Sequence, residues 1–195
     1  MATTGDRRAR RVAAPLATVV AAGVAVAGCT STPATVPHPM MGGGYHYSRT
    51  VCSAPGTLPG QRVRVLLGDM GMRRMMGGVA PRGALMMLHA FPSRVAAGQV
   101  TFVVANRGWR THELVVLPLG PEAVAGHRRV SPVGRVSESG SLGEASRSCG
   151  PGTGDGITSG AVGWTTMHLE GGRYELVCNL RNHYANGMYQ ELDVS

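Results

Sequence analysis

The sequence predicts an all-β fold, an antiparallel Greek-key β-sandwich. Short apolar stretches alternate with polar residues at the period of a strand, and helix-like periodicity is scarce. The chain contains 29 glycines, which are typical of frequent turns. A length of 195 residues is enough for one hydrophobic core and short for two. We therefore expect one β-domain, which we assign to residues 59–195.

Residues 1–28 have the features of an export signal. Four arginines precede an apolar run from Val12 to Ala27, which is short for a permanent membrane span and rich in alanine and glycine. The run ends in Val-Ala-Gly-Cys29, which resembles the bacterial lipobox, where the cysteine is lipidated. We expect Cys29 to carry a lipid anchor. An ordinary signal peptide with a nearby cleavage site, or an uncleaved anchor, is the alternative.

Residues 29–58 are expected to form a flexible tether, because Thr, Ser, Pro and Gly dominate and apolar periodicity is absent. The tether contains two imidazoles and two thioethers, which together have the chemistry of a weak copper site. A plain linker is the favoured interpretation. The side chains concerned are His38, Met40, Met41 and His46.

The domain is expected to begin with an alternating strand at 62–67 and to continue, after a methionine-rich segment, with a strand at 85–88. Clustered thioethers are soft ligands that suit Cu(I). They are also pliable apolar filler for an irregular loop. We favour packing, and we keep a secondary Cu(I) site as the alternative. That site would consist of Met70, Met72, Met75 and Met76.

Two further strands follow, and their parity locates one histidine. Every second residue from Val100 to Val104 is apolar, so these side chains share one face. The same parity from His112 to Val116 points His112 inward, at the end of a sheet. His89, in an earlier strand, is expected to be a surface or hydrogen-bonded histidine.

Residues 119–163 interrupt the strand pattern. They are rich in Gly, Ser and Pro and show no clear strand. A loop of this length is unusual in a compact domain unless it is functional or disordered. We interpret the segment as an insertion between core strands and expect His127 within it to be solvated.

The last part of the chain forms a predicted hairpin that leads into a group of metal-ligating side chains. Strands at 164–169 and 173–178 flank a turn, and alternation points Cys178 inward. Cys178, His183 and Met188 follow with the spacing Cys-x4-His-x4-Met, and a final strand begins at Met188. The alternative is a buried free cysteine beside a surface histidine and a core methionine, which requires all three spacings and both flanking strands to be accidental.

A thiolate, an imidazole and a weak thioether are the ligand types that select copper in a trigonal site with a long axial bond. One more imidazole is needed. His112 is the best candidate, because it also lies at the mouth of an apolar strand. We therefore predict one copper ion bound by His112, Cys178, His183 and Met188.

This ligand loop resembles that of the cupredoxins, the blue copper proteins, and within them the rusticyanin and sulfocyanin type. The similarity covers roughly residues 60–195. It includes the Val-Ala-Asn-x-Gly segment that ends at Gly108 and the His-Glu-Leu segment that begins at His112. The resemblance implies a single-electron carrier and not an enzyme. Many cupredoxins have Asn or Ser after the first histidine, and here Glu113 puts the hydrogen bonding around the thiolate in question.

The resemblance also implies how electrons leave the site. The histidine of the ligand loop, here His183, is the ligand nearest solvent in the family and provides the exit. Redox partners such as a cytochrome, oxidase or reductase would dock near His183, on an apolar patch that includes Tyr184 and Ala185. We expect a monomer.

The remaining cysteines predict a disulfide. With Cys29 assigned to lipid and Cys178 to metal, Cys52 and Cys149 are left in loops of an exported protein, where disulfides form. A Cys52–Cys149 bond would close a loop of about a hundred residues, worth at most about 4–5 kcal/mol in the chain-entropy model. Two unpaired thiols are the alternative.

Charge and composition exclude several other functions. The net charge is +8 and all basic residues are Arg, but they are scattered and no basic helix is present, so we expect no nucleic-acid partner. A multicopper enzyme would need further histidine clusters, and a binuclear copper centre would need two cysteines in one loop. The main alternative is a lipoprotein for Cu(I) storage, delivery or resistance that uses the methionine-rich segment and His46.

Overall fold

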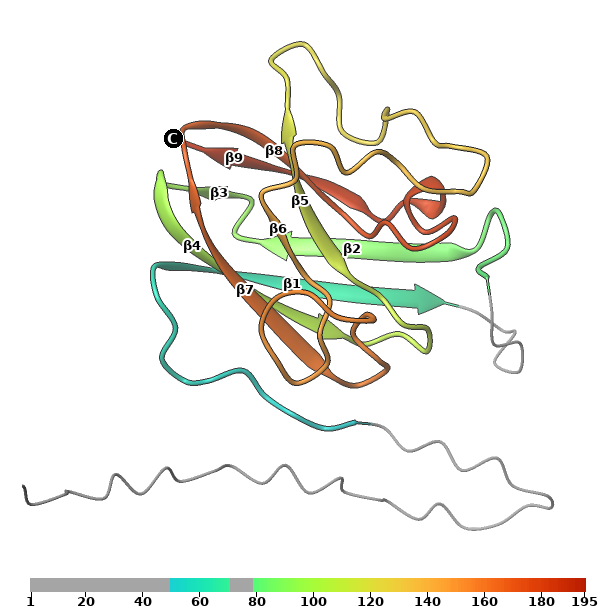
Figure 1. The fold of residues 1–195 in the computed structure, drawn as a ribbon, viewed down its shortest axis with the longest axis horizontal. Helices are drawn as coiled ribbons and strands as arrows, with labels where there is room; N and C mark the ends of the chain where they lie inside the picture. Colours follow the sequence, from blue (N-terminus) through green and yellow to red (C-terminus); the bar gives the residue numbers. More distant parts are fainter. Residues whose placement is uncertain (1–49, 71–78) are drawn as a thin grey trace, which may run out of the picture. The chain divides into compact units, whose positions relative to one another are not determined.

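The protein is described by a computed structural model, which places residues 50–70 and 79–195 (Figure 1). Two β-sheets face each other, one with the strand order β2-β1-β4-β7 and one with the order β3-β9-β8-β5-β6. The predicted all-β sandwich is confirmed. The strands are β1 (Gln61–Met70), β2 (Leu85–Phe91), β3 (Arg94–Val95), β4 (Gly98–Asn106), β5 (Leu114–Leu119), β6 (Gly143–Ala145), β7 (Val162–Leu169), β8 (Gly172–Val177) and β9 (Tyr189–Val194).

The sheets differ from the prediction in one respect, because they are mixed and not purely antiparallel. Strand β1 pairs in parallel with β4, and β3 pairs in parallel with β9, whereas the other neighbours are antiparallel. Alternation of apolar and polar residues is the same in parallel and antiparallel strands. The direction of a neighbouring strand is therefore not encoded in the pattern from which the fold was predicted.

The hydrophobic core lies between the two sheets and follows the predicted parity. The inward faces of β1 and β4 are fully buried, and so are those of β8 and β9 around Leu176 and Leu192. This core includes Cys178 and Met188. The first and last ligands of the predicted loop, Cys178 and Met188, are therefore parts of the sandwich core.

Strand β5 is buried on both faces, which the parity argument did not anticipate. Leu114 and Val116 belong to the core between the sheets. Their neighbours Val115 and Leu117 belong to a second apolar cluster on the outer face, together with Val136, Val177 and Tyr184. Because Val136 comes from the predicted insertion, that segment covers the outer face of the second sheet.

The predicted insertion, residues 119–163, contains more regular structure than expected, and the part outside strands is shorter. Its first residue ends β5, its last two residues begin β7, and residues 143–145 form strand β6, which pairs with β5. A strand of three residues is too short to produce a recognisable alternation. In Figure 1 the segment between β5 and β6 runs alongside the loop that follows β8.

The disulfide between Cys52 and Cys149 is confirmed. Cys52 is half-buried, and its sulfur accepts a hydrogen bond from the backbone N–H of Val162 in β7. The bond therefore attaches the segment before β1 to the edge of the first sheet and to the loop before β7.

Replacement of both cysteines by serine is expected to lower the free energy of unfolding by about 2–4 kcal/mol, because the bond closes a loop with a sequence separation of 97. Chemical denaturation of the double variant and the wild-type protein measures this loss. Copper binding should survive, since neither sulfur belongs to the ligand group. An unchanged free energy of unfolding would contradict the expectation.

Several predictions concern residues outside the described ranges. These are the leader, lipidation at Cys29, the tether as far as residue 49, and the methionines at 72, 75 and 76. In residues 50–70 and 79–195, no helix has the length and apolar character needed to cross a membrane.

Candidate metal centre

Three of the predicted ligands meet at one end of the sandwich. His112 precedes β5, Cys178 follows β8, and His183 lies in the loop between β8 and β9. The Nδ1 atoms of His112 and His183 are 3.1 Å apart. The sulfur of Cys178 is 3.3 Å from Nδ1 of His183 and 4.0 Å from Nδ1 of His112. All three side chains are buried. No other group of potential metal ligands is found in the described part of the chain.

These separations fit a single metal ion. Nitrogen and sulfur donors about 2.0–2.3 Å from a shared metal lie roughly 3–4 Å from one another. Met188 is fully buried in the same core as Cys178. The backbone N–H of Cys178 donates to the carbonyl of Met188 at 3.0 Å, which fixes the two ends of the loop against each other. Two imidazoles, a thiol and a thioether are the donor set of a type 1 copper site.

The two-sheet β-sandwich and the group of His112, Cys178 and His183 agree with the fold and ligands that the sequence resemblance implied. No protein-family model matches the sequence, and no curated protein matches it. Among solved structures, reduced rusticyanin is similar with 22% identity and a TM-score of 0.37, over 71% of this chain and 82% of that one. The fold is established by this chain's own strand order and ligand group.

Two auracyanins are also similar to this chain. Auracyanin B has 18% identity and a TM-score of 0.43, over 73% of this chain and 94% of that one. Auracyanin A, described as a "blue" copper protein from the green thermophilic photosynthetic bacterium Chloroflexus aurantiacus, has 14% identity and a TM-score of 0.40. That match covers 69% of this chain and 99% of auracyanin A.

The protonation states of the ligands follow from their burial. Burial, together with the nearby charge of Glu113, raises the pKa of the Cys178 thiol to about 12. Burial and the neighbouring His112 lower the pKa of His183 to about 3, so this imidazole is neutral. A metal ion that binds here meets a neutral imidazole lone pair at His183 and must displace the proton of Cys178.

A backbone N–H donates a hydrogen bond to the sulfur of Cys178. The N–H of Glu113 points at this sulfur at a distance of 3.4 Å. A peptide N–H is present whatever side chain follows His112, so the departure from the family pattern leaves this hydrogen bond intact. The Glu113 carboxyl is buried, and burial together with the charges of Glu144 and Glu138 raises its pKa to about 7.

Asp69 in β1 contacts His112 and was not anticipated from the sequence. Its Oδ1 lies 3.1 Å from Nε2 of His112 and accepts the backbone N–H groups of Trp109 and Arg110 at 2.8 and 3.0 Å. Burial alone would raise the Asp69 pKa, but the hydrogen bonds of His112, Arg110 and Trp109 outweigh it and lower the pKa to about 2. The alternation that points the side chains of β1 inward also includes Asp69 near the end of the strand. The sequence therefore indicated that this side chain faces inward.

The ligand loop is held by hydrogen bonds on the side of the insertion. The side chain of Asn179 accepts a hydrogen bond from the N–H of Val136 at 2.7 Å and donates one to the carbonyl of Val136 at 3.0 Å. These two bonds have the same pattern as those between paired residues in neighbouring β-strands. The N–H of Asn182 donates to the carbonyl of Gly134 at 2.8 Å. The segment that we interpreted as an insertion is therefore a support for the ligands.

The other side of the loop is fixed by the segment before β2. Asn182 adopts a left-handed conformation with φ of 67° and donates from its side chain to the carbonyl of Ala80 at 2.8 Å. Asn186, in the 3-10 helix η1 (Tyr184–Asn186), donates to Pro81 and accepts from Gly83, each at 2.8 Å. These bonds define the positions of His183 and its neighbours without regular secondary structure.

The prediction of an exposed docking patch is wrong for one of its residues. Tyr184 is only 2% exposed, because the segment between β5 and β6 covers it, and its hydroxyl donates to Glu175 at 2.9 Å. Ala185 is exposed, as predicted. Of the two histidine ligands, His183 is 5% exposed and His112 is fully buried, in the order that the resemblance implied.

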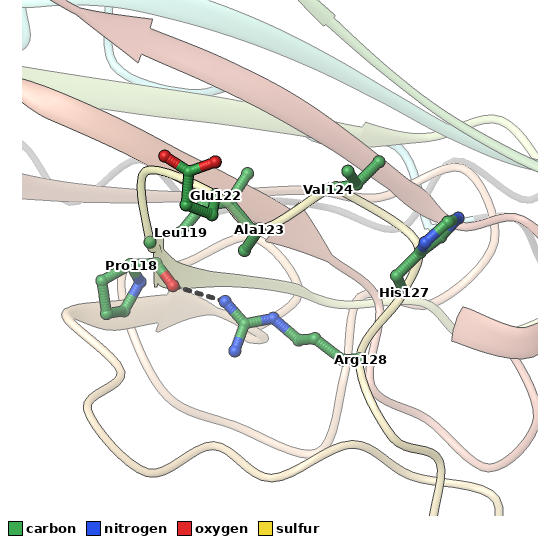
Figure 2. Close-up of a pocket in the computed structure, with 8 residues that line it drawn as sticks. Pro118, Leu119, Glu122, Ala123, Val124, His127 and Arg128 are labelled. Atoms are coloured by element: carbon green, nitrogen blue, oxygen red, sulfur yellow. Dashed lines mark hydrogen bonds between the residues drawn. The ribbon is translucent and has the colours of Figure 1, made fainter.

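Other histidines and Met70 stand apart from the ligand group. His89, His127 and His168 are exposed on the surface. Met70 ends β1 with 72% of its surface exposed, and the secondary Cu(I) site remains a prediction. Figure 2 shows a separate pocket beside β5 that contains no predicted copper ligand. It is lined by Pro118, Leu119, Gly120, Glu122, Ala123, Val124, His127 and Arg128.

Proposed function

We propose that this protein is a blue copper protein that carries single electrons between redox partners. The observation that supports the proposal is the convergence of His112, Cys178 and His183 at one end of a β-sandwich, with Met188 buried in the adjoining core. When bound, copper supplies a one-electron couple, Cu(II)/Cu(I). His112, Cys178 and His183 would bind the copper, with Met188 as a weak fourth ligand.

The protein's own contribution to this function is rigidity. Electron transfer is easier when the two oxidation states share nearly the same ligand positions. Buried side chains exclude water from the ligand group, the N–H of Glu113 supports the sulfur, and hydrogen bonds from Asn179 and Asn182 restrain the loop. No bond is made or broken in a substrate, so we propose an electron carrier and not an enzyme.

The partners follow from the exposed side of the site. We propose that electrons pass through the imidazole of His183 to a redox protein that docks near Ala185. The protein would act as a monomer and would not bind nucleic acid, because its arginines are scattered.

The proposed location is outside the cytoplasm, in a periplasm-like space or at the outer face of the cell membrane. The Cys52–Cys149 disulfide supports an oxidising compartment. The arginine-led apolar segment and the lipobox-like residues before Cys29 support export and attachment by lipid. Mass spectrometry of the membrane fraction, before and after Cys29→Ala, tests the lipid.

Copper stoichiometry combined with the visible spectrum tests the proposal. We expect one copper per chain and an intense blue or green thiolate-to-copper band that reductant bleaches and oxidant restores. A colourless protein that binds several Cu(I) ions would overturn the electron-carrier function. It would favour the Cu(I) storage or delivery protein that uses the methionine-rich segment.

A further inference from the structure

We propose that Asp69 is a positioning residue for His112, and that its carboxylate lowers the reduction potential of the copper site relative to a neutral hydrogen-bond acceptor. The inference rests on the proposed copper site, and it deepens that proposal by assigning a residue that tunes it. Asp69 belongs to β1, in the opposite sheet from the strands that flank the ligands.

The carboxylate of Asp69 is held independently of His112. Its side chain is 6% exposed, and the backbone N–H groups of Trp109 and Arg110 both donate to Oδ1. The turn that carries these groups is itself fixed, because Asn106 accepts the N–H of Gly108 and donates to the carbonyl of Arg110 at 2.7 Å. The oxygen that faces Nε2 of His112 is therefore in place before any metal binds.

Gly108 shows how closely the chain packs against this pair. A Cβ atom at position 108 would lie 2.1 Å from Oδ1 of Asp69 and 2.9 Å from Nε2 of His112. Contacts below 3 Å essentially never occur for a real Cβ, so only glycine allows the turn to approach Asp69 and His112 this closely. The backbone at Gly108 thus packs directly against the Asp69–His112 pair.

The pairing sets the tautomer of His112. An ionised carboxylate can only accept a hydrogen bond, so the imidazole must carry its proton on Nε2. The lone pair is then on Nδ1, the atom that faces Cys178 and His183. An asparagine at position 69 is less selective, because its amide can either accept from Nε2–H or donate to an Nε2 lone pair.

The charge of the carboxylate also distinguishes the two oxidation states. Oxidised copper carries one more positive charge than reduced copper, and a buried negative group stabilises the higher charge more. A carboxylate that accepts the outer N–H of a histidine ligand also makes that imidazole a more basic ligand. Both effects favour Cu(II), and both are weakened when the acceptor is a neutral amide.

The test compares Asp69→Asn with Asp193→Asn, a matched loss of one carboxylate at the surface, where Asp193 pairs with Arg94. For Asp69→Asn we expect Cu(II) affinity to fall about 10–100-fold, as for other outer partners of metal-bound histidines. The fall in Cu(I) affinity should be at least ten times smaller than the fall in Cu(II) affinity. The reduction potential then rises by ~59 mV for each factor of ten between the two affinities. Asp193→Asn should leave the potential close to that of the wild-type protein.

A second measurement needs no copper. Nitrogen-15 NMR of the full-length metal-free protein should show His112 protonated on Nε2. The Nδ1–H tautomer, or equal potentials for Asp69→Asn and Asp193→Asn, would overturn the role of Asp69. If the wild-type protein shows no thiolate-to-copper band, the proposed function fails instead, and the NMR result still decides whether Asp69 positions His112.

Discussion

Cys178→Ala is expected to abolish the visible thiolate-to-copper band and to lower Cu(II) affinity by several orders of magnitude. The sulfur is the strong ligand of the group, and the remaining imidazoles and thioether provide no negative charge. Cys178 is fully buried, and the other cysteines in residues 50–70 and 79–195 form a disulfide, so no free thiol there can replace it. Titration with Cu(II), followed by absorbance and by competition with a chelator, measures both effects.

A matched variant separates the loss of the ligand from a loss of fold. Cys178→Ser keeps the size of the side chain but replaces the soft sulfur with a hydroxyl, which stays protonated. We expect this variant to fold with a similar far-ultraviolet circular dichroism spectrum and still to lack the band. Persistence of the band in either variant would show that the copper ligand is another sulfur.

The parts of the site that depend on parity and spacing were predictable from the sequence. Alternation placed His112 and Cys178 on inward faces, and both are buried at the same end of the sandwich. The Cys-x4-His-x4-Met spacing identified the loop because its residues are close along the chain. The disulfide followed from the assignment of the other cysteines and not from any geometric pattern.

The parts that were missed depend on contacts between distant segments. Asp69 lies 43 positions from His112, and no local pattern indicates that β1 runs beside the turn at Gly108. The burial of Tyr184 requires the segment between β5 and β6 to fold over the outer face of β5. A Gly- and Ser-rich composition gives no periodicity from which such a covering segment can be recognised.

This covering segment leads to the second large expected effect. Arg128 donates from Nε to the carboxylate of Glu175, which is fully buried in β8, and also reaches the carbonyl of Pro118, as Figure 2 shows. Glu175 further accepts from the hydroxyl of Tyr184, the residue after the ligand His183. We expect Arg128→Leu to lower the free energy of unfolding by about 3–5 kcal/mol, because it leaves a buried carboxylate without its cation.

A double-mutant cycle tests the physical cause of that loss. In a Glu175→Gln background the carboxylate is absent and the guanidinium keeps only neutral acceptors, so Arg128→Leu should cost about 1.5–3 kcal/mol, less than in the wild-type protein. Arg129→Leu, at an exposed neighbouring position, is the matched control and should change stability little. Equal losses in the two backgrounds would mean that Arg128 stabilises the segment by packing alone. The covering segment would then hold Tyr184 in the ligand loop without help from the buried charge pair.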